Sequence, residues 1–205
     1  MAGEQLAKEQ VEIIGSVVDK ILTMMGAARD AFNRHSRDRL EELKNLKTQV
    51  AQGTKAAAKE VEAQMAKKPE AERVVGARLQ SILIRLEIIG ETVGDLMDPI
   101  QKKIQAGVLF SDKAVSQTNY LFDQQAGMLR SLLDIVKTDN EFLKKYLLDL
   151  GRSLIQSCSD FATEHEARMI EGLCLPQAAP LFLTLLDRMR TLCQHEVEIA
   201  KILAK

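Results

Sequence analysis

The sequence has few of the residues that build sheets and irregular loops. It contains no Trp, and its 2 Tyr and 6 Phe amount to 4% of the 205 residues. Only 4 Pro and 11 Gly are present to interrupt regular structure. Because β-strands favour aromatic and β-branched residues, this shortage argues against a β-sandwich. We therefore expect an all-α protein that packs through Leu, Ile, Met and Ala.

Long apolar runs and paired cysteines are also missing. The longest stretch without a charged residue, Gly172–Leu186, is shorter than the roughly 20 residues that cross a bilayer. Cys158, Cys174 and Cys193 lack the CxxC spacing of a zinc ribbon and are expected to act as small core residues. The first residues are acidic where a secretory signal would be basic and then apolar. A cytoplasmic protein is expected, with no membrane span and peripheral at most.

Neither sign of charge predominates. The 28 Lys and Arg face 29 Asp and Glu, so the net charge is −1. A nucleic-acid partner is not expected, because such proteins concentrate basic charge to neutralise phosphates. The chain contains no HExxH or GxSxG motif, and a metallohydrolase would need a general base and a closed pocket that the sequence does not show. A non-enzymatic role is expected.

Apolar residues recur at three- and four-residue steps along most of the chain, as in amphipathic helices. Ser36 is a predicted N-cap, and Pro99 predicts a kink in the third helix. The pattern predicts six long helices. The first three run from Glu4 to about Asn33, from Ser36 to about Lys67, and from Glu70 to about Gln105. The fourth starts at Ser111 and Asp112 and runs through Val136, the fifth follows the polar cluster 138–140 and runs to about Ile170, and the sixth is introduced by Pro176 and Pro180 and runs to the C-terminus.

The six predicted helices form two sets of three. A proline precedes the third helix of each set, at Pro69 and Pro176, and each set spans about 100 residues. Short connections between long helices favour antiparallel neighbours. We predict two tandem antiparallel three-helix bundles, over residues 1–105 and 106–205. They either stand as separate bundles or share one continuous core.

The third predicted helix carries a row of acidic residues. Glu87, Glu91, Asp95 and Asp98 follow one another at steps of four, four and three residues, which places all four on one side of a helix. Carboxylates are ligands for Fe, Zn or Mn, so this stripe is a candidate metal site. A solvated helix face is the alternative explanation.

A second, weaker row follows about one hundred residues later. Asp187, His195 and Glu198 repeat the spacing of the first stripe, with Thr191 in the remaining position. Histidine is the commonest protein ligand of transition metals. Asp187, His195 and Glu198 are therefore further candidate metal ligands.

Two glycines interrupt the third predicted helix at positions one turn apart. Gly90 and Gly94 each cost about 1 kcal/mol relative to alanine in a helix interior. Such a pair indicates a close approach by a neighbouring helix. It does not form a phosphate-binding loop, which requires a different glycine spacing after a strand.

The segments around the third predicted helix match a pattern found in a known family. Arg85–Glu91 reads R-L-E-I-I-G-E and is followed by Asp95. This resembles the E-R-I-G-D line, with a further Asp or Asn, of the PhoU phosphate-uptake regulators. Met65–Pro69 also looks like that family's connection into its third helix. In the second half, Asp187–Thr191 reads D-R-M-R-T, without the family's Gly and second Asp.

The resemblance to PhoU covers most of the chain and implies both a fold and a role. It implies two three-helix repeats with metal at the acidic stripes. It also implies a non-enzymatic adaptor that damps phosphate uptake or phosphate-starvation signalling. The expected partners are a phosphate transporter or its sensor histidine kinase, and a homodimer is possible. The alternative is a metal-independent helical scaffold or accessory domain of a sodium/phosphate or other phosphate transporter.

Overall fold

The protein is a bundle of long helices. The computed structural model describes residues 8–66 and 69–204, without the side chains of 70–72, and contains no strand within them. Its elements are α1 (Lys8–Arg34), α2 (Arg37–Met65), α3 (Glu70–Asp95), α4 (Met97–Gln105), α5 (Asp112–Thr138), α6 (Glu141–Ile170) and α7 (Ala178–Leu203). Because α3 and α4 together form the predicted third helix, the all-α prediction with six long helices is confirmed. The predicted start at Glu4 lies outside the described residues.

The third helix breaks one turn earlier than the kink predicted at Pro99. At the break, the Leu96 amide bonds to the Val93 carbonyl at 3.2 Å, the short spacing of a 3₁₀ turn. Regular bonding resumes when the Ile100 amide donates to the Leu96 carbonyl at 3.3 Å. Pro99 has no amide hydrogen to donate to the preceding turn, and its ring crowds that turn, so the helix yields before the proline.

The connection between the first and second helices has the same construction in both halves. His35 and Asp139 both adopt left-handed backbone conformations, with φ of 54° and 50°. Each is followed by a helix cap. The predicted cap Ser36 accepts from the Arg39 amide, and Asn140 accepts from the amides of the first turn of α6. These side chains satisfy amides that the helix leaves unpaired, and so fix where α2 and α6 begin.

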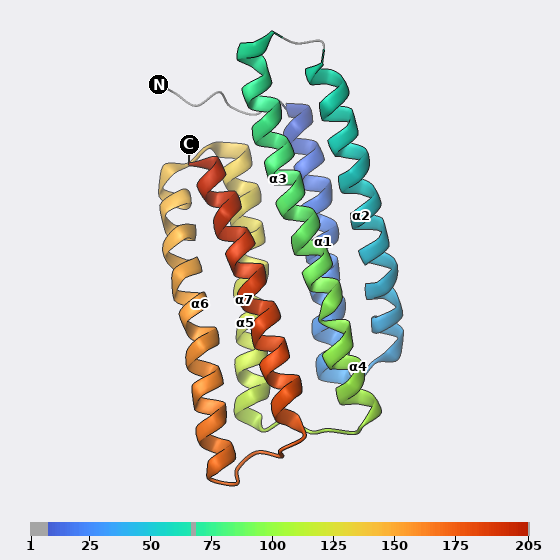
Figure 1. Cartoon of the computed structure of the whole chain (residues 1–205), viewed down its shortest axis with the longest axis vertical. Coiled ribbons are helices and arrows are strands. Elements are labelled where there is room, and N and C mark those ends of the chain that lie inside the picture. The colour runs from blue at the N-terminus through green and yellow to red at the C-terminus, as the bar shows by residue number, and fades with distance from the viewer. Residues whose placement is uncertain (1–7, 67–68, 205) are drawn as a thin grey trace.

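The two halves lie side by side and share one core. Figure 1 shows α3 and α7 next to each other along the molecule, with α2 and α6 at its two outer edges. Behind them, α1 packs on α5. One continuous apolar cluster runs through both halves. Of the two arrangements left open by the sequence, the structure therefore adopts the shared core. The predicted division after residue 105 falls at the end of α4.

None of the helices within residues 8–66 and 69–204 combines the length and the apolarity that crossing a bilayer requires.

Within the described residues, the shared core encloses a carboxyl group that has one unpaired oxygen. Glu196 on α7 is 1% exposed, and its Oε2 atom has no hydrogen-bond partner among the described residues. Burial raises the pKa of Glu196 well above its ordinary value, because the charged form loses its hydration. The folded protein therefore binds this proton more tightly than the unfolded chain does. The contribution of Glu196 to stability is complete below its unfolded pKa, near 4.5, and is lost as the pH rises toward the folded value.

Glu196→Gln is expected to stabilise the protein at pH 8 and to have little effect at about pH 3.5, below the unfolded pKa of the carboxyl. The amide keeps the shape of the protonated acid but never ionises. At pH 8 we expect a gain of at least about 1 kcal/mol, or roughly 2–4 °C in melting temperature. The measurement is thermal unfolding at both pH values.

The matched control is Glu198→Gln, two residues further along α7. Glu198 has a lowered pKa because Lys201 donates a hydrogen bond to it, so its substitution should destabilise the protein above pH 4.5. A Glu196→Gln variant whose stability tracks the wild type at every pH would contradict the account.

Candidate functional site

The predicted acidic stripe contains a positive charge supplied by the chain itself. The Lys47 ammonium on α2 lies 2.9 Å from Glu91 Oε2 and 2.9 Å from Asp95 Oδ1 on α3. Glu87 is half-buried one turn away on the same helix. The structure therefore brings two of the predicted ligands together, and does so around a lysine.

The fourth member of the stripe lies beyond the break at Leu96. Asp98 belongs to α4 and pairs with Lys102 at 2.8 Å, one turn along the same helix. Sequence spacing had treated residues 87–98 as one uninterrupted helix. The break divides the stripe, and its two parts hold different lysines.

Gly94 makes the position of Lys47 possible. A Cβ atom on Gly94 would lie 2.3 Å from Lys47 Cδ and 2.9 Å from Lys47 Cγ. At Gly90, a Cβ atom would lie 2.6 Å from Val50 Cγ1, one turn further along α2. Both distances are well inside van der Waals contact. The close helix approach predicted from this glycine pair is confirmed, and the neighbour is α2.

The ion pairs outweigh the cost of partly burying Lys47. Burial by itself would lower the pKa of Lys47, but the hydrogen bonds to Glu91 and Asp95 raise it above its ordinary value. A raised lysine pKa means that the folded state favours the charged ammonium. This contribution to stability is complete below the unfolded pKa, near 10.5, and is lost as the pH rises through the folded value.

The predicted residues of the second stripe also contact basic groups. Asp187 pairs with Arg190 at 2.7 Å, and Glu198 pairs with Lys201 at 2.8 Å. His195 Nδ1 lies 3.2 Å from Arg85 Nη1, across the contact between α7 and α3. Burial and then the Arg85 charge lower the pKa of His195, so its imidazole is neutral at pH 7.

These contacts bear on how a metal would fit. Within the described part of the chain, no three His, Cys, Asp or Glu side chains are grouped so that they could hold a metal ion. A metal at Glu91 and Asp95 would first have to displace the Lys47 ammonium, so the side chains as placed do not fit one. The seven metal ligands named from the sequence remain a prediction. Lys47 itself was missed, although Gly94 offered a signal that a neighbouring side chain approaches there.

A second lysine was missed at the end of the bundle where α4 ends. Lys103 is 4% exposed, and its ammonium lies 5.0 Å from the centre of the Phe32 ring and 5.6 Å from that of Phe110. It also lies 3.3 Å from the Phe32 carbonyl and contacts His35 Nε2. Burial lowers the pKa of Lys103. The ring faces and the carbonyl replace part of the water that this cation loses.

Two of the three cysteines are confirmed as core residues. Cys158 and Cys193 are buried and Cys174 is half-buried. Burial raises the pKa of Cys158 to about 12, so its thiol is protonated at physiological pH. Burial also raises the pKa of Cys193, whose thiol donates to the Gly151 carbonyl at 3.2 Å.

Comparison with known structures reveals the same fold. The structure of PhoU from Pseudomonas aeruginosa superposes with a TM-score of 0.87 and 14% identity, over 96% of this chain and 94% of that one. The structure of the phosphate transport system regulatory protein PhoU from Streptococcus pneumoniae superposes with a TM-score of 0.84 and 14% identity. That superposition covers 96% of this chain and 92% of the other. This chain has the PhoU-like fold. No protein-family profile and no curated protein sequence matches it.

The fold match extends over both halves of the chain, since it covers almost all of each protein. The PhoU-like resemblance drawn from Arg85–Glu91 and Met65–Pro69 is confirmed at the level of fold. At 14% sequence identity, the two superpositions show a shared fold alone. The description as a regulatory protein of a phosphate transport system applies to the Streptococcus pneumoniae protein.

Removing the Lys47 ammonium is expected to destabilise the protein modestly and in a salt-dependent way. Lys47→Met keeps most of the apolar stem but leaves Glu91 and Asp95 facing each other without a cation. We expect a loss of about 0.5–1 kcal/mol at low salt and a smaller loss at high salt, because the pair is partly exposed. Urea unfolding at two salt concentrations measures it.

Lys44→Met is the matched control, because Lys44 is an exposed lysine on the same helix with no ion pair within the described residues. It should change stability little. Equal losses for the two variants, or a Lys47→Met loss that does not depend on salt, would show that the paired carboxylates do not stabilise Lys47.

Proposed function

We propose that this protein is a non-enzymatic regulatory adaptor of phosphate uptake or phosphate-starvation signalling. One observation carries the proposal: the PhoU-like fold is kept over 96% of the chain and over at least 92% of two PhoU structures. One of those is described as a regulatory protein of a phosphate transport system. The agreement of the Arg85–Glu91 motif with that fold adds to it, because the motif falls on the corresponding third helix.

The proposed partners are a phosphate transporter, its sensor histidine kinase, or both, at the cytoplasmic face of the membrane. A homodimer is a further proposed assembly. Balanced charge supports docking to proteins over attraction to anionic lipid, which requires clusters of basic residues. An adaptor of this kind acts through its surface, and needs no activated nucleophile or catalytic base.

In this proposal the acidic stripe works without a metal. Lys47 supplies the positive charge between Glu91 and Asp95, where a metal-tuned adaptor would place its ion. This contact favours the metal-independent form of the proposal, including the alternative of a scaffold or accessory domain attached to a phosphate transporter. Binding of Fe, Zn or Mn at the stripe, which the resemblance to PhoU implies, is the competing prediction.

The adaptor role predicts a specific set of partners in cells. The tagged full chain is purified from phosphate-replete cells of its own source under mild detergent, and its partners are identified by mass spectrometry. We expect components of a phosphate transporter, or its histidine kinase, to be enriched over a strain that expresses the tag alone. The regulatory claim further predicts that phosphate uptake rises when the protein is removed.

One variant serves as a control for the role of the acidic stripe. The Lys47→Met variant, which should fold, is expected to recover the same partners, because the proposal does not route docking through a metal. Recovery of neither component, together with unchanged phosphate uptake in cells lacking the protein, would overturn the proposed function.

A further inference from the structure

A hollow of about 300 Å³ opens between the start of α2 and α4. Arg37, Leu40 and Glu41 reach it from α2, and Met97 and the residues one and two turns later reach it from α4. Neither Glu91 nor Asp95 lines it, and it takes no part in the proposed adaptor role. Its volume is at the lower end of the range for small-molecule sites.

Arg37, the basic residue at this hollow, has no ion-pair partner among the described residues. No ion pair within the described residues engages Arg37, whereas its neighbour Arg39 pairs with both Asp30 and Glu42. Arg37 is also the first residue of α2, where the helix dipole is positive. A guanidinium presents several donors in one plane and matches the two oxygens of a carboxylate or phosphate. Arg37 is therefore free to donate to an anion.

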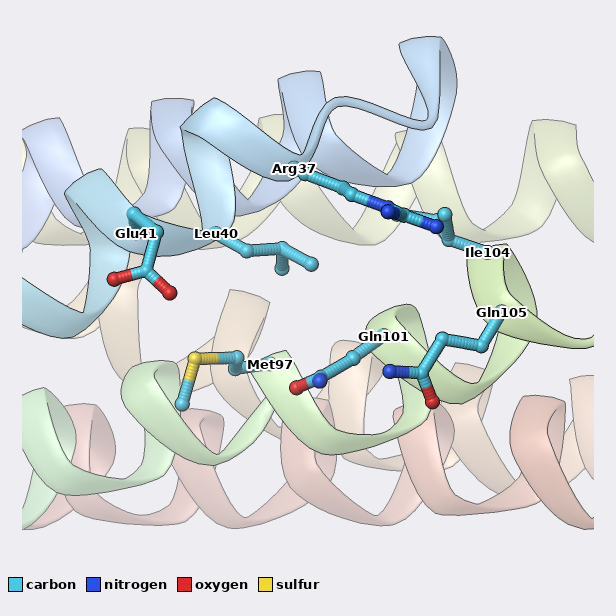
Figure 2. Close-up of a pocket in the computed structure, with 7 residues that line it drawn as sticks. All are labelled: Arg37, Leu40, Glu41, Met97, Gln101, Ile104 and Gln105. Atoms are coloured by element: carbon cyan, nitrogen blue, oxygen red, sulfur yellow. The ribbon is translucent and has the colours of Figure 1, made fainter.

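Two amide side chains face the same space. Gln101 and Gln105 are one turn apart on α4, and Figure 2 shows their amide ends beside the hollow, opposite Arg37. Their NH₂ groups are donors without charge. Arg37 and the two amides thus provide donors from both helices.

The remaining walls are apolar. Leu40 is buried, and Met97 and Ile104 are half-buried around the hollow. An inorganic anion would leave these side chains without a contact. A ligand with a short apolar or aromatic body would cover them, and would gain about 25 cal/mol for each Å² removed from water.

We infer that the hollow binds a small organic anion, namely a carboxylate or phosphate monoester carried on a short apolar or aromatic body. Arg37 donates to the anionic head, Gln101 and Gln105 donate to its remaining oxygens, and Leu40, Met97 and Ile104 cover the body. Glu41, which also reaches the hollow and has no ion pair within the described residues, repels the head. Glu41 therefore limits the affinity and makes it sensitive to a single substitution.

The opposing effects of Arg37 and Glu41 make the inference testable. Isothermal titration calorimetry of the full chain uses phenyl phosphate and benzoate as probes. Inorganic phosphate is the comparison ligand, because it is an anion without an apolar or aromatic group. We expect at least one organic probe to bind at a single saturable site. Inorganic phosphate should bind at that site more weakly. Comparison of the two organic probes identifies which head the site prefers.

Three variants assign the binding to this hollow. Arg37→Gln should weaken the preferred probe at least tenfold, whereas Glu41→Gln should strengthen it several-fold. Arg34→Gln, which removes a nearby exposed arginine that pairs with Asp30 outside the hollow, should leave the affinity unchanged. Circular dichroism confirms that each variant folds.

Three results would overturn the inference. The first is no saturable binding of either organic probe up to roughly 10 mM. The second is equal weakening by Arg37→Gln and Arg34→Gln, which would indicate non-specific attraction to surface charge. The third is an affinity unaffected by Glu41→Gln and Arg37→Gln. None of these outcomes depends on whether the protein associates with a transporter or a kinase.

Discussion

The close approach of α2 to α3 controls the chemistry of the acidic face. Gly90 and Gly94 remove the side chains that would hold the helices apart. Val50 occupies the space at Gly90, and the stem of Lys47 lies against α3 in the space at Gly94. Its ammonium then sits between Glu91 and Asp95. Two carboxylates one turn apart on a helix repel each other, so a cation between them is stabilising. Here the chain provides that cation from a neighbouring helix, at the cost of two glycines in α3.

The fold followed from the sequence because its signals are local and repeated. Apolar periodicity, the cap at Ser36, and prolines at the breaks each constrain the few residues around them. The shared core did not follow, because the same amphipathic helices can bury their apolar faces within one bundle or between two. Here α3 packs on α7 and α1 on α5, and these contacts join residues about one hundred positions apart. The sequence predicted the kink at Pro99, one turn after the observed break at Leu96, because a proline disturbs the residues before it.

The candidate site shows where sequence reasoning ends. Spacing on one helix correctly put Glu91 and Asp95 on a common face, but it carries no information about which side chain of the next helix meets that face. Lys103 and Glu196 illustrate the same limit in the core. Each belongs to a residue type that is mostly solvated. Only the packed structure reveals that Lys103 meets two aromatic rings and that Glu196 Oε2 has no hydrogen-bond partner among the described residues. Both are consequences of tertiary contacts and leave no local pattern.

The central claim is that Lys47, and not a metal, neutralises the acidic face of this PhoU-like protein. Elemental analysis of protein purified without chelator or nickel tests it most directly, combined with thermal unfolding before and after chelation. The account predicts far less than one equivalent of iron, zinc or manganese, and a melting temperature that chelation does not change, since only a bound metal would stabilise the folded state. Near-stoichiometric metal in the wild type, lost together with thermal stability in Glu91→Ala/Asp95→Ala, would contradict it.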